Sequence, residues 1–109
     1  MRLRIGHLDY DVSAMSVDEA DEEGVDGLCQ HHLQRIRVRE ELPPSQQAGV
    51  LLHEVLHALW NVYAIPRRGL TEEEVVARLE APLLMLLRDN RHLVVALYAA
   101  LDHDTKVVG

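Results

Sequence analysis

The stretch LLHEVLHALW, residues 51–60, places three polar side chains within a run of apolar ones. His53 and His57 are four residues apart, and Glu54 follows the first histidine. The apolar residues around them recur at the three- and four-residue spacing of an amphipathic helix. In a helix, residues i and i+4 project from one face about one turn apart. The stretch therefore predicts a core helix with two imidazoles side by side on one face.

Two imidazoles in this arrangement can bind one Zn²⁺ from adjacent tetrahedral directions, as in the HExxH pattern. Glu54 stands beside the first histidine, where it can accept a proton from a water on the metal and pass it to a leaving amine. The alternative is a helix whose histidines donate to carbonyl groups and whose glutamate faces solvent. The pattern favours His53 and His57 as zinc ligands and Glu54 as the catalytic base.

A catalytic zinc ion needs a third protein ligand and an open fourth position. The nearest carboxylates lie in TEEEVVARLE, residues 71–80, which reads as the start of a second helix. The predicted inward face of this helix consists of Val76, Leu79 and Leu83. Because side chains of the first turn project back toward the N-terminus, Glu73 is the preferred third ligand. Glu72 and Glu80 are the alternatives, and Glu74 points away.

Other polar residues are weaker candidates for the site. His92 and Tyr98, in the last predicted helix, could polarise a substrate carbonyl, although such residues are more often groups at the edge of a core. His31 and His32 lie beside Cys29, but neighbouring residues of a strand point to opposite faces. We therefore interpret the histidine pair as a solvated turn and the cysteine as a small buried hydrophobe.

Short alternating stretches before the motif predict β-strands. Residues 2–12 alternate apolar and polar side chains, and residues 27–31 and 34–39 read as a hairpin with a polar turn. Residues 16–24 are acidic, and we expect them to form a solvated loop. These segments predict a small antiparallel sheet of three to four strands.

About three helices are expected after the strands. One covers about 45–63 and holds the motif, a second begins after Thr71 and contains Pro82, and a third covers about 90–101. Residues 102–109 are expected to be a frayed tail. Strands followed by helices are typical of an α+β fold with the helices on one face of the sheet. The length of 109 residues predicts a single domain.

Composition excludes several classes of function. The formal net charge is −7, so a nucleic-acid partner is not expected. No apolar run approaches the length of a membrane span, and the N-terminus lacks the apolar region of a signal peptide. The single cysteine excludes an internal disulfide and fits a reducing compartment. We expect a cytoplasmic protein that does not bind membranes.

Two segments resemble a known family. LPPSQQAGVLLHEVLHALW (42–60) and TEEEVVARLEAPLLMLLRDN (71–90) resemble small phage- and prophage-associated zinc metallopeptidase-like proteins, which are related to the ImmA/IrrE group of the HExxH-plus-glutamate (gluzincin-like) class. The resemblance covers about residues 2–101 and implies a minimal zincin-like, metallopeptidase-like domain. The site residues that it implies are His53 and His57 as zinc ligands, Glu54 as the base, and a ligand within the cluster Glu72, Glu73 and Glu74.

These observations predict a zinc-dependent metallopeptidase that hydrolyses peptide bonds in a protein or peptide substrate. The substrate would add as an extended strand along the sheet edge near 36–39, with its scissile carbonyl on the zinc. The alternative is a non-catalytic interaction module of phage or prophage origin, in which zinc only joins the helices. A structural zinc site usually has four protein ligands, so a further ligand such as His92 would favour this alternative.

Overall fold

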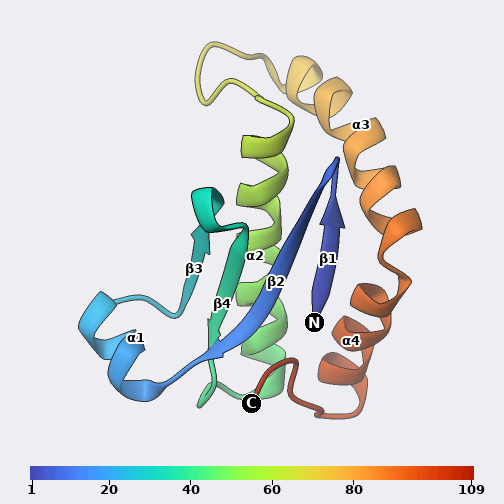
Figure 1. Ribbon diagram of the computed structural model, residues 1–109. Helices are drawn as coiled ribbons and strands as arrows, with labels where there is room; N and C mark the ends of the chain where they lie inside the picture. Colours follow the sequence, from blue (N-terminus) through green and yellow to red (C-terminus); the bar gives the residue numbers. More distant parts are fainter.

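Four strands and four α-helices make up the computed structural model, which describes residues 1–109 (Figure 1). The strands are β1 (Arg2–Ile5), β2 (Leu8–Met15), β3 (Gly27–Gln30) and β4 (Arg35–Arg39). The helices are α1 (Val17–Glu23), α2 (Pro44–Val62), α3 (Glu72–Asp89) and α4 (Arg91–Asp102), with a short 3₁₀ turn, η1 (His31–Leu33), between β3 and β4. The predicted α+β class is confirmed, with one more helix than expected.

The sheet is mixed, which corrects the predicted antiparallel arrangement. Its strand order is β1-β2-β4-β3, with β1–β2 and β3–β4 antiparallel and β2–β4 parallel. Parallel neighbours need a long crossover between them. Here α1 and β3 together supply that crossover, and they carry the chain from the end of β2 back to the start of β4. As a result, β4 lies inside the sheet and β3 is an edge strand.

The acidic segment 16–24 forms helix α1, so the expected loop is wrong. The Ser16 side chain caps the helix by accepting a hydrogen bond from the Glu19 amide, and Gly24 ends it in the left-handed conformation, with φ 69°. Ala20 is buried on its inner side. Arginines of β4 pair with its acidic side chains, Arg37 with Glu19 and Arg39 with Asp21. The charges that suggested a solvated loop therefore hold the helix against the sheet.

Helix α2 supplies one layer of the core and lies against one face of the sheet, while α3 and α4 run beside β1 (Figure 1). The residues that α2 contributes to the hydrophobic core are Leu51, Val55, Ala58 and Leu59. They join one hydrophobic cluster with residues of β1, β2, β4, α3 and α4. Helix α3 continues past Pro82, which is buried. No helix combines the length and the hydrophobicity that crossing a lipid bilayer requires.

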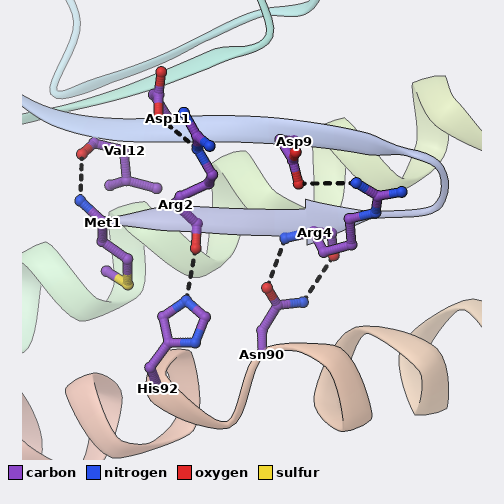
Figure 2. A network of polar contacts seen from close by, with 8 residues as sticks. All are labelled: Met1, Arg2, Arg4, Asp9, Asp11, Val12, Asn90 and His92. Carbon is purple, nitrogen blue, oxygen red and sulfur yellow. Dashed lines mark hydrogen bonds and ion pairs between the residues drawn. The ribbon is translucent and has the colours of Figure 1, made fainter.

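The outer edge of β1 is closed by the junction between α3 and α4 (Figure 2). The Asn90 side chain accepts a hydrogen bond from the Arg4 amide at 2.6 Å and donates one to the Arg4 carbonyl at 2.7 Å. It thus imitates the backbone of a neighbouring strand. The Nε2 atom of His92 lies 2.6 Å from the Arg2 carbonyl oxygen. The Arg4 amide and the carbonyl groups of Arg2 and Arg4 on this edge are therefore occupied by side chains.

The C-terminal residues are held against the start of α2, which contradicts the expected frayed tail. Gln47 is fully buried, and its Oε1 atom accepts hydrogen bonds from the Val107 and Val108 amides at 2.8 and 3.2 Å. Its Nε2 atom donates to the Val108 carbonyl at 3.1 Å. Residues 103–109 have no regular secondary structure, but one buried amide fixes their path.

Candidate metal centre

The HExxH residues lie in the middle of α2, on the boundary between its buried and exposed faces. The buried apolar residues of the helix fix its rotation against the sheet. That rotation leaves His53 and His57 exposed on one side of the helix. It turns Glu54 toward the protein, so that this residue is only 7% exposed. The motif therefore places its two imidazoles toward solvent and its carboxylate toward the protein.

The two imidazoles converge on one point. The Nε2 atoms of His53 and His57 are 3.1 Å apart, and the rings meet edge to face with centroids 4.8 Å apart. Two nitrogen ligands of one tetrahedral zinc ion, each at the usual Zn–N distance, would be about 3.3 Å apart. The ligand atoms of His53, Glu54 and His57 all lie within 4.8 Å of one another. This spacing fits a single zinc ion shared by the two histidines.

The Glu54 residue is 7% exposed and makes no hydrogen bond or ion pair with a protein group. Its carboxylate is not fully enclosed, because it lines a cavity at the sheet edge and is not among the buried polar atoms that lack a partner. Gly27 of β3 makes room for it, because a Cβ atom there would lie 3.1 Å from Glu54 Cγ. The chain thus places a carboxylate without a protein partner beside the two imidazoles, which also fits a metal centre.

The predicted third ligand is not brought to this cluster. Glu73 and its alternatives, Glu72 and Glu80, are exposed on α3. This helix runs along β1, at the opposite edge of the sheet from β3 (Figure 1). The predicted inward face of α3 is only partly correct, because Leu83 packs against the core while Val76 is 55% exposed. The buried residues of this helix are Pro82 and Leu86. The path of the loop between α2 and α3 determines where these glutamates lie and which face of α3 is buried. No local sequence pattern predicts that path.

The predicted electrophiles are also absent from the centre. His92 is held at the β1 edge by its contact with the Arg2 carbonyl oxygen. Tyr98 is 62% exposed on α4. Neither residue lines the cavity beside the motif histidines. His92 is therefore also unavailable as a further ligand that would close the site.

The position of His31 differs from the one that the sequence predicts. The structure places it in the wall of a cavity of about 780 Å³ beside α2. The residues that line this cavity are His31, His53, Leu56, His57, Trp60, Asn61, Ala64, Ile65 and Arg67. Burial lowers the pKa of His31, and the nearby charges of His57 and Arg67 lower it further. The expected turn is confirmed, because His31 and His32 both lie in η1. His32 is exposed, whereas His31 is half-buried and lines the cavity.

Cys29 lies between the sheet and the motif helix. Burial raises the pKa of its thiol to about 12, and the Glu54 carboxylate contributes to the increase. The thiol is therefore protonated at neutral pH, and a protonated thiol is a poor nucleophile. This agrees with its interpretation as a small hydrophobic residue rather than a reactive one.

The free edge of the sheet lies at β3, beside Glu54. The Arg39 amide donates to the Asp26 carbonyl at 2.8 Å, so Asp26 and Arg39 form a hydrogen-bonded pair of the β3–β4 ladder. Along antiparallel strands, hydrogen-bonded pairs alternate with pairs that are not hydrogen-bonded to each other. The N–H and C=O groups of Gly27 and Cys29 therefore point away from β4. The predicted substrate edge at 36–39 is wrong, because those residues belong to β4, inside the sheet.

A second, shallower cavity of about 390 Å³ follows this edge between β3 and α2. The residues that line it are Val25, Asp26, Gly27, Gly49, Val50, His53 and Glu54. It therefore connects the open strand edge with one motif histidine and with the Glu54 carboxylate. An extended segment on this edge would run past the metal centre.

Comparison of the chain with protein-family models, with curated proteins and with solved structures finds no match to any of them.

Proposed function

We propose that the protein is a zinc-dependent metallopeptidase of the HExxH type, with Glu54 as its catalytic base. The observation that carries the proposal is the pair of converging Nε2 atoms of His53 and His57, with the Glu54 carboxylate beside them and without a protein partner. A metal centre with a general base accounts for all three side chains together.

In this proposal the two histidines and the glutamate of the motif have separate roles. His53 and His57 would hold the zinc ion, which lowers the pKa of a bound water to about 7 and polarises a carbonyl oxygen. Glu54 accepts a proton on its carboxylate and returns it to the nitrogen of the leaving amine. It has no protein partner that would have to be displaced first.

The substrate is a protein or peptide segment in an extended conformation. The outward N–H and C=O groups of Gly27 and Cys29 can pair with its backbone, as in other cases of strand addition. The adjoining cavity then leads its scissile bond toward Glu54. The single cysteine fits action in a reducing compartment such as the cytoplasm.

The test measures zinc content and hydrolysis separately. We expect about one zinc ion per chain after purification without added metal, and none in the His53→Ala/His57→Ala double variant. Glu54→Gln should retain zinc but lose hydrolysis of a quenched fluorescent peptide library. Glu80→Gln, at an exposed carboxylate of α3, is the matched control and should retain both properties. Full zinc occupancy in the double histidine variant would refute the proposed centre.

The second candidate is a non-catalytic, zinc-containing interaction module of phage or prophage origin. The observation that favours it is the set of large apolar side chains exposed on α3 and α4, which includes Leu84, Val95, Tyr98 and Leu101, each more than half exposed. The same library separates the two candidates. A wild-type protein that holds zinc and cleaves no member would favour the module, whereas cleavage lost in Glu54→Gln favours the peptidase.

A further inference from the structure

His31 occupies the position opposite the motif histidines. It begins η1, directly after β3, so the chain turns at this residue instead of continuing to alternate. Two residues earlier, Cys29 faces α2, because it pairs with the buried Ile36 on the same side of the sheet. The turn keeps the His31 ring on this side, where it lines one cavity together with His53 and His57.

The orientation of the His31 ring is controlled through its Nδ1 atom. This atom lies 3.5 Å from the Tyr10 hydroxyl oxygen and 3.5 Å from Cys29 Sγ. Tyr10 is fully buried, and its hydroxyl has no other hydrogen-bond partner. A ring that donates from Nδ1 to the phenol oxygen retains the lone pair on Nε2. Histidine ligands of metals usually show this arrangement, with the second nitrogen held by a hydrogen-bond partner behind the ring.

We propose that His31 is the third protein ligand of the metal centre, binding through Nε2, with Tyr10 as the positioning residue behind it. This inference rests on the proposed zinc site, and it replaces the glutamate expected from α3. Three histidines from η1 and α2 leave the fourth position open, as a catalytic zinc ion requires. Glu54 then has no role as a ligand and is free to act as the base.

The ring must move for the ion to be bound by all three histidines. The group of ligand atoms within 4.8 Å of one another contains only His53, Glu54 and His57, so His31 lies outside it. The Nε2 side of the ring would have to move toward His53 and His57 within the cavity that all three residues line, while Nδ1 keeps its contact with Tyr10. Metal binding should therefore change the environment of His31 more than that of its exposed neighbour, His32.

The first experiment measures Zn²⁺ affinity by competition with a chromophoric chelator for the full chain and its variants. His31→Ala should weaken zinc binding by more than about 100-fold, because loss of groups that merely support a ligand already costs about 10–100-fold. Tyr10→Phe, which keeps the buried ring but removes the hydroxyl, should cost about 10–100-fold. The matched control His32→Ala, and Glu73→Ala on α3, should bind zinc as the wild type does.

The second experiment needs no variant and covers the case in which His31→Ala fails to fold. Long-range ¹H–¹⁵N NMR spectra of the full chain report which nitrogen of each histidine binds the metal. On addition of Zn²⁺, the Nε2 resonances of His31, His53 and His57 should move together, while those of His32 stay in place. Unchanged His31 resonances, or wild-type affinity in folded His31→Ala, would overturn the assignment while leaving the two-histidine centre intact. Absence of any zinc-induced shift in the wild type would overturn both proposals.

Discussion

Gly27→Ala is a sharp test of how β3 is packed against the motif helix. The added Cβ atom would lie 2.4 Å from Val50 Cγ1 and 3.1 Å from Glu54 Cγ. Unstrained carbon atoms approach to about 3.5–4.0 Å, so the first contact overlaps by about 1 Å. Val50 cannot relieve it easily, because a β-branched side chain in a helix has one strongly preferred rotamer. The strand and the helix must therefore separate.

Overpacking of this kind costs about 1–3 kcal/mol, and each kcal/mol lowers the melting temperature of a domain of this size by about 4–8 °C. We expect thermal unfolding followed by circular dichroism to show a decrease of about 5–20 °C. The control Gly49→Ala, at an exposed helix position with no heavy atom within 4 Å, should instead stabilise the protein by about 0.5–1 kcal/mol. The Gly27→Ala/Val50→Ala double variant should recover part of the loss. A Gly27→Ala protein as stable as the wild type would refute the described contact.

Three further predictions concern the rest of the fold. Asn90→Ala leaves backbone groups of β1 without partners and should lower the free energy of unfolding in urea by at least about 2 kcal/mol; an unchanged midpoint would contradict the closed edge. Gln47→Ala should speed hydrogen exchange at the amides of residues 107–108, which donate to its side chain, while amides of the sheet keep their rates. The hydrogen bond from Arg37 lowers the pKa of Glu19 in the folded protein below its usual value of 4.5. The ionised Glu19 carboxylate therefore contributes to stability above pH about 4.5, and this contribution is lost as the pH falls through the lower folded-state pKa. The difference in stability between wild type and Glu19→Gln should therefore shrink between pH 6 and pH 3, and a constant difference would contradict the ion pair.

The sequence is sufficient to predict those parts of the structure in which a local spacing of residues determines how their side chains are placed. The spacing of His53 and His57 in an apolar helix predicts their convergence, because a helix always places i and i+4 on one face. Sequence also contains a signal for α1 that the acidic composition obscured, since Ser16 precedes Glu19 by the three residues of a capping box. Both features depend only on neighbouring residues.

Features that depend on contacts between residues far apart in the sequence could not be predicted from local patterns. The position of β4 inside the sheet follows from its parallel pairing with β2, which a hairpin pattern does not report. His31 looks like half of a solvated pair until the sheet places it across from α2. The predicted role of Glu73 assumed a direct antiparallel return after α2, whereas α3 crosses to the β1 side (Figure 1). The register of strands and the path of loops are properties of the whole fold.

The closed edge at β1 limits how two molecules of this protein can associate. A sheet with two free edges can add strands from both sides and grow without end. Here Asn90 and His92 occupy the β1 edge, so growth is possible only from β3. Two molecules that joined through β3 would each present only a closed edge to the outside. Edge-to-edge association therefore stops at a two-fold symmetric dimer, and filaments cannot form by this route.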